Sequence, residues 1–129
     1  MPSPEELYKA QVVNLPECQD PWFQETLARA RTGDEGALRD ISGRCLVIPL
    51  QIAEKYWRPD FGFTLLDLIE EGNRVLMKIT KNFTVSSAAE FICKVKEEID
   101  VRILRIVEHP ALFLEEIEIQ EKWFRDHGY

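Results

Sequence analysis

The side chains that could support catalysis are few and scattered. The two histidines are His109, which directly precedes a proline, and His127, which lies near the C-terminus. The three cysteines (Cys18, Cys45 and Cys93) are widely spaced and form no CxxC pair, so they do not indicate a metal site. Neighbouring carboxylates on a helix diverge by about 100° and cannot act as a pair. We therefore expect no catalytic residue, no metal, no cofactor and no enzymatic activity.

One group of charged residues does have a spacing that suits binding. Asp67 lies three and four residues before Glu70 and Glu71, and Arg74 lies four and three residues after them, which places all four on one side of a helix. Carboxylates in this arrangement can pair with the arginines and lysines of a partner helix. The plain alternative is a solvated helix face with no partner.

Composition limits the class of protein. The chain has 129 residues, 45% of them apolar, which is enough for a single core and one domain. The formal charge of −7 argues against a general nucleic-acid-binding protein, since such a protein needs a basic face. The longest apolar run, 45–50, is too short to cross a membrane, and the N-terminal residues do not form a secretory signal. Widely spaced, reduced thiols are typical of a cytoplasmic protein.

Helix signals cover nearly the whole chain. A capping box at Ser3 begins a short helix that should end before Pro16, and a second helix should run from Asp20-Pro21 to about residue 31. Apolar spacing then predicts one long helix over 34–56, kinked near Cys45 because Pro49 lies inside it. Further helices are predicted from Thr64, from Ser87 and over 111–126.

These signals predict an all-α protein, a compact bundle of about five to six helices. We expect a short helix and linker over 1–25, a helical domain over 26–108, and an acidic C-terminal helix over 109–129 packed on the same domain. Trp123 and Phe124, near the end of that last helix, are expected in the core, with a partner contact as the alternative.

Two stretches resemble the bacterial RNA polymerase sigma factor family. Residues 28–46 (ARARTGDEGALRDISGRCL) are similar to the segment that leads into the second conserved region of the family. Residues 65–83 (LLDLIEEGNRVLMKITKNF) resemble its D-L-I-Q-E-G-N-x-G-L-M pattern. The matching residues are Asp67, Leu68, Ile69, Glu71, Gly72, Asn73, Leu76 and Met77. Glu70 replaces the usual glutamine, and Val75 replaces a second glycine.

The resemblance implies the sigma region-two fold and a role in transcription initiation or its regulation. In that family the helix that matches 65–83 docks on a coiled coil of the largest subunit of core RNA polymerase. By motif match, the polymerase-binding residues are Leu66, Asp67, Glu70, Glu71, Asn73 and Met77.

The residues with which sigma factors read and melt promoter DNA are largely replaced. The family's next helix opens with a run of aromatic residues, where this chain has VSSAAEFICKV over 85–95. Phe91 and Lys94 are the remaining candidates for a weak DNA contact, but the helical spacing of Phe91 with Val95 and Ile99 favours the core. We expect DNA binding to be weak or absent. The alternative function is a helical protein-interaction module, derived from a sigma domain, that binds neither polymerase nor DNA.

Overall fold

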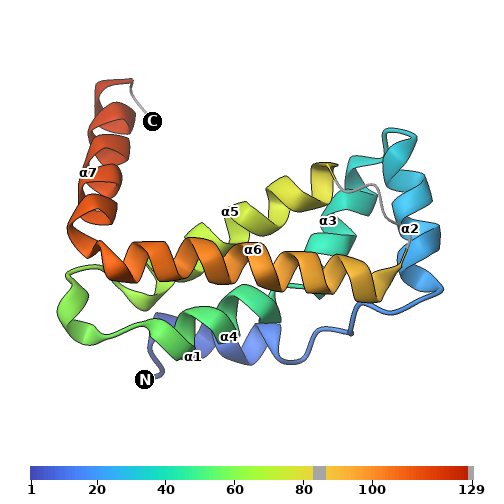
Figure 1. Ribbon diagram of the computed structural model, residues 1–129, viewed down its shortest axis with the longest axis horizontal. Helices are drawn as coiled ribbons and strands as arrows, with labels where there is room; N and C mark the ends of the chain where they lie inside the picture. Colours follow the sequence, from blue (N-terminus) through green and yellow to red (C-terminus); the bar gives the residue numbers. More distant parts are fainter. Residues whose placement is uncertain (83–86, 128–129) are drawn as a thin grey trace.

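The computed structural model describes residues 1–82 and 87–127, and within them the chain is all-helical, with no strand (Figure 1). The seven α-helices of these residues are α1 (Pro4–Val12), α2 (Trp22–Arg31), α3 (Glu35–Arg44), α4 (Val47–Tyr56), α5 (Leu65–Asn82), α6 (Ala88–Glu108) and α7 (Pro110–Asp126). A short 3-10 helix, η1 (Pro59–Phe61), precedes α5. The predicted all-α fold is confirmed. Phe83, the last residue of the predicted docking helix, lies outside the described residues.

Local capping explains where several helices begin. The Ser3 hydroxyl accepts a hydrogen bond from the Glu6 amide at 3.1 Å, and the Glu6 carboxylate accepts one from the Ser3 amide. The Asp34 carboxylate accepts from the Ala37 amide at 3.2 Å, and the Ser87 hydroxyl is the N-cap of α6. Each side chain satisfies an amide that the first turn of a helix leaves unpaired, so these predicted starts are confirmed.

Asp20 has a different role from the predicted one. It was expected to begin the second helix, but Pro21 is the N-cap of α2 and makes no side-chain cap. The Asp20 carboxylate instead accepts a hydrogen bond from the amide of Ala88, at the start of α6, at 3.3 Å. Asp20 therefore connects the chain before α2 to the first turn of a helix that follows 68 residues later.

The predicted helix over 34–56 is two helices. The chain turns at Cys45 and Leu46, where the amide of Cys45 donates to the Ser42 carbonyl at 3.0 Å and that of Ile48 to the Cys45 carbonyl at 3.0 Å. The break places Pro49 in the first turn of α4, where a helix does not need the amide that proline lacks. The kink predicted near Cys45 is therefore a complete break, which the continuous apolar spacing did not indicate.

The core lies where α4, α5 and α6 pack together, with α2 and α3 at one end (Figure 1). The predicted inner face of α6 is confirmed, because Phe91, Val95, Ile99, Ile103 and Ile106 are all buried. Leu68, Ile69, Leu76 and Ile79 of α5 are buried against them. α5 thus turns one face inward and leaves its polar face exposed or half-buried.

The C-terminal helix α7 packs on the bundle near its beginning, reaches α5 through Gln120, and projects away from the bundle (Figure 1). Phe113, its one buried residue, packs edge-on against Phe63 with the ring centroids 4.9 Å apart. Beneath this contact, Gly62 has a positive φ of 90°, and a Cβ there would lie 3.1 Å from Leu114. Trp123 and Phe124 are 48% and 50% exposed, so the expectation that they belong to the core is wrong.

Candidate partner-docking site

α5 carries the six residues that the sequence singled out for partner binding. The helix starts with a reciprocal cap: the Thr64 amide donates to the Asp67 carboxylate at 2.8 Å, and the Asp67 amide donates to the Thr64 hydroxyl at 3.1 Å. This cap fixes Asp67, which is half-buried and already engaged within the helix. Asp67 therefore stabilises the start of α5 rather than offering both carboxylate oxygens to a partner.

Glu71 is held by cations of its own chain. Its carboxylate accepts from the guanidinium of Arg74 at 2.8 Å and from Arg102 of α6 at 3.1 Å, and its side chain is only 13% exposed. Arg102 also reaches Glu116 of α7 at 3.1 Å. Charge-assisted hydrogen bonds of this kind join α5, α6 and α7 at one place. Glu71 thus acts mainly inside the fold.

Asn73 and Leu66 are also partly engaged with the rest of the chain. The amide of Asn73 donates to the Tyr8 hydroxyl of α1 at 3.2 Å, while its carbonyl oxygen is buried and accepts no hydrogen bond within the described residues. Leu66 is half-buried and packs against the core. Both residues can make van der Waals contacts with a partner, but neither carries a charge.

The structure brings Glu70, Asn73 and Met77 together on one outward surface of α5. They line a shallow hollow whose other residues are Arg74, Lys78, Lys81 and Asn82. Glu70 is exposed, and within residues 1–82 and 87–127 its carboxylate takes part in no ion pair. Glu70 and Met77 are therefore the members of the predicted set that remain most accessible to a partner.

α7 forms a second wall beside this surface, which the sequence did not predict. A cleft between α5 and α7 is lined by Asp67, Glu70, Glu71 and Arg74 on one side. The other side carries Phe113, Glu116, Ile117, Gln120, Glu121 and Phe124. The Arg74 guanidinium crosses the cleft to the side-chain carbonyl of Gln120 at 3.4 Å. Only the direction of α7 brings these residues together, and no spacing in the sequence encodes that direction.

The two candidates for a DNA contact do not form a site. Phe91 is 1% exposed and lies against Phe23, with the ring centroids 5.1 Å apart. Its ring therefore cannot stack on a base while the domain is folded, and the core interpretation is confirmed. Lys94 is exposed and bound to Glu98 at 2.7 Å, and this hydrogen bond raises the pKa of the Lys94 ammonium.

Comparison with known proteins adds no relative, since neither a protein-family model nor a curated protein matches the chain. A search of the described residues finds no group of three or more His, Cys, Asp or Glu side chains that could hold a metal ion. Among the same residues, no helix combines the length and the apolar character needed to span a bilayer.

The cysteines are free, and two of them are buried and in contact. Cys45 donates a hydrogen bond to Cys18, which lowers the pKa of the Cys18 thiol. The same bond, together with burial, raises the pKa of Cys45. Cys93 is exposed on α6. The buried pair therefore consists of packed core thiols, and Cys93 is the accessible one.

Proposed function

We propose that this chain is a sigma-like domain that docks on bacterial core RNA polymerase through α5 and acts in transcription initiation or its regulation. The observation that carries the proposal is the outward surface formed by Glu70, Asn73 and Met77, three of the six residues that match the docking positions of sigma factors. This function places the protein in the bacterial cytoplasm.

Within this surface Glu70 is the residue that suits a basic partner helix, since the other charged residues of the hollow, Arg74, Lys78 and Lys81, are cations. Glu70 can accept charge-assisted hydrogen bonds from an arginine or lysine of the partner. Met77 supplies a flexible apolar contact next to it. Asp67 and Glu71 hold α5 in place, because Asp67 caps the start of the helix and Glu71 binds Arg102 of α6.

The proposed role does not include melting of DNA by Phe91, which belongs to the core. Docking without strand separation fits a regulator that occupies the sigma site, or a minimal sigma factor that relies on other groups for promoter contact. The acidic α7 beside the docking surface opposes the approach of a DNA duplex to this side of the protein.

The test is capture of purified bacterial core RNA polymerase by the tagged full-length chain. Glu70→Lys reverses one exposed charge, and we expect it to weaken binding by about tenfold or more if Glu70 faces a basic helix. Glu108→Lys is the matched control, because it makes the same charge change at the exposed C-terminal end of α6, where a cation is favoured.

Equal binding by Glu70→Lys and Glu108→Lys would contradict the assignment of this surface. Failure of the well-folded wild-type chain to bind the polymerase would remove the sigma-like function. The alternative, an interaction module with a different partner, would then stand, and the exposed apolar residues at the far end of α7 favour it.

A further inference from the structure

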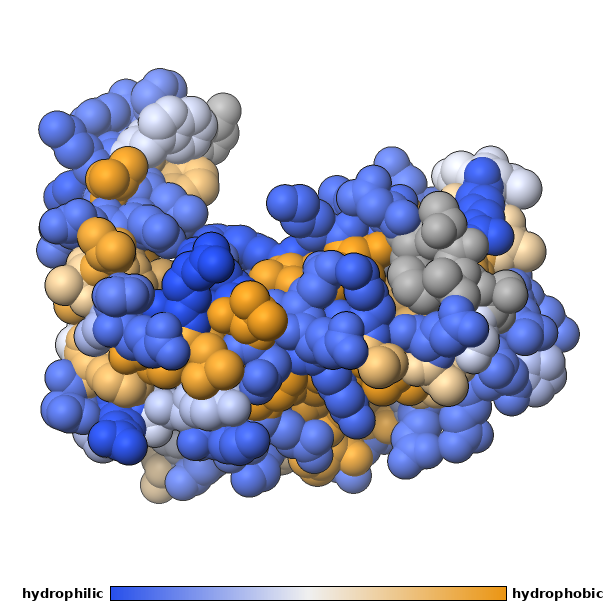
Figure 2. Space-filling view, viewed as in Figure 1, coloured by the Kyte–Doolittle hydropathy of each residue, from blue (hydrophilic) through white to orange (hydrophobic). Residues whose placement is uncertain are grey.

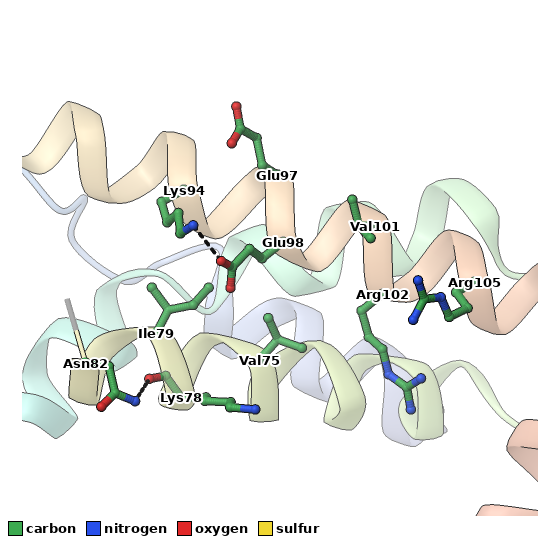
Figure 3. A pocket seen from close by; sticks show the side chains of 10 residues that line it. All are labelled: Val75, Lys78, Ile79, Asn82, Lys94, Glu97, Glu98, Val101, Arg102 and Arg105. Atoms are coloured by element: carbon green, nitrogen blue, oxygen red, sulfur yellow. Dashed lines mark hydrogen bonds and ion pairs between the residues drawn. The ribbon is translucent and has the colours of Figure 1, made fainter.

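A second surface lies between α5 and α6 and adjoins the docking site, with which it shares Lys78 and Asn82. It is a groove of about 620 Å³ whose apolar floor is formed by Val75, Ile79 and Val101. Figure 3 shows Val75 and Ile79 pointing from α5 toward α6, and apolar residues reach the surface along this face in Figure 2. Val101 is 60% exposed, although it lies at the centre of a long core helix.

Cations outnumber acids around this groove. Its charged residues are Lys78, Lys94, Arg102, Arg105, Glu97 and Glu98. Lys94 is neutralised by Glu98, and Arg102 is engaged by Glu71 and Glu116. Lys78 and Arg105 form no ion pair with any residue that the structure describes. The groove therefore suits an apolar segment that carries acidic side chains.

The distal half of α7, residues 115–126, has that chemistry. Glu115, Ile119, Trp123 and Asp126 follow at intervals of four, four and three, so they form one stripe along the helix. Ile119 is 68% exposed and Trp123 is 48% exposed. The stripe therefore presents two apolar residues with a carboxylate at each end, complementary to the floor and the cations of the groove.

The α7 helix cannot reach the groove of its own chain in this fold. The helix is anchored as far as Gln120, by Phe113 against Phe63 and by the bonds from Arg102 to Glu116 and from Arg74 to Gln120. Beyond that anchor the helix points away from α6 (Figure 1). Ile119 and Trp123 remain exposed on this anchored helix, so another molecule can reach them.

We propose that the α5–α6 groove receives the distal half of α7 from a second copy of this chain. Ile119 and Trp123 lie on Val75 and Val101 of the other copy, and the acidic ends of the stripe face Lys78 and Arg105. The contact joins two different surfaces and is therefore heterologous. A single helix in a groove is a small interface, which predicts weak, concentration-dependent association.

Analytical ultracentrifugation of the full chain tests this proposal. Over a range from about 5 to about 300 µM, the weight-average mass of the wild-type protein should rise above that of the monomer. Val101→Glu in the groove and Ile119→Glu on α7 should each move this rise to at least about tenfold higher concentration. Leu7→Glu on α1 is the matched control, since Leu7 is an exposed apolar residue, and it should leave association unchanged.

Mixing the two variants distinguishes this contact from other modes of association. A Val101→Glu chain keeps an intact α7, and an Ile119→Glu chain keeps an intact groove. Their mixture should therefore associate more strongly than either variant alone. A wild-type chain that stays monomeric throughout the range, association unaffected by Val101→Glu, or a mixture no better than its components would each overturn the proposal. Because the substituted positions are exposed, circular dichroism of the variants should match that of the wild type. Arg105→Glu is a second groove variant, which should weaken association in the same way as Val101→Glu.

Discussion

Gly72 of α5 lies directly against Pro49 of α4. A Cβ at position 72 would come within 2.9 Å of the Pro49 Cβ and 3.5 Å of a methyl group of Ile99 on α6. At this position α4 and α6 both lie within contact distance of α5 because the glycine has no side chain. The sequence Glu71-Gly72-Asn73 of α5 therefore places a packing residue between two polar residues that bind other helices, Glu71 to Arg102 of α6 and Asn73 to Tyr8 of α1.

We predict that Gly72→Ala destabilises the protein, although alanine favours a helix by about 1 kcal/mol over glycine. The added methyl meets a rigid proline ring, and overpacking of this kind costs about 1 to 3 kcal/mol. Gly43→Ala on α3 is the control, because a Cβ there meets nothing within 4 Å, and it should stabilise by up to about 1 kcal/mol. Urea unfolding of both variants measures the difference, and a stabilised Gly72→Ala would show that α4 and α5 separate easily.

Glu71 and Glu70 are adjacent in the sequence but should differ in their effect on stability. Glu71→Ala removes the shared partner of Arg74 and Arg102, and we expect a loss of about 1 to 2 kcal/mol after allowing for the partial exposure of both arginines. Glu70→Ala should stay within about 0.5 kcal/mol of the wild type. Chemical denaturation compares the two variants, and equal stabilities would mean that Glu71 is not needed to join the helices.

Local signals predicted most helix starts, because a capping side chain acts within three residues of its own position. Ser3, Asp34, Thr64 and Ser87 all cap as expected. The bend near Cys45 was predicted as a kink, but not as the end of one helix and the start of another, since apolar spacing runs through it. The use of Glu71 inside the fold was not predicted either, because its partner Arg102 lies 31 residues away and only the packing of α6 brings it near.

Phe113 and Phe124 lie on the same helix, α7, but should contribute differently to the free energy of unfolding. Phe113 is 5% exposed and packs on Phe63, so Phe113→Ala should cost about 3 kcal/mol. Phe124 is 50% exposed and packs edge-on against Trp123 of the same helix, so Phe124→Ala should cost about 1 kcal/mol at most. Thermal unfolding of the two variants gives the comparison. A large loss for Phe124→Ala would place the distal helix in the folded core.

The thiols should react in two classes with a disulfide reagent at neutral pH. Cys93 is exposed and should react at once, whereas Cys18 and Cys45 are buried and should react at least about 100-fold more slowly, through opening of the fold. Adding denaturant should make the slow pair fast, and Cys93→Ser should remove the fast phase. Three equally fast thiols in the native protein would contradict the buried arrangement of Cys18 and Cys45.

The exposure of Trp123 and Phe124 shows why the end of the molecule was harder to predict than its middle. Their apolar character indicated the core, and α7 does begin there with Phe113. Burial farther along depends on the angle at which the helix leaves α6. That angle is set by contacts between distant segments and leaves no periodic signal in α7 itself.

Gly62, in the loop before α5, is one of the residues that contact the base of α7. Its left-handed backbone leaves room for Leu114 at the base of α7, and a side chain at position 62 would press on that leucine. The helix extends about 18 Å beyond Leu114, so a small rotation at its base moves its C-terminal end by a larger distance. A side chain at residue 62 thus acts on the base of α7 through Leu114, while every residue of α7 stays the same.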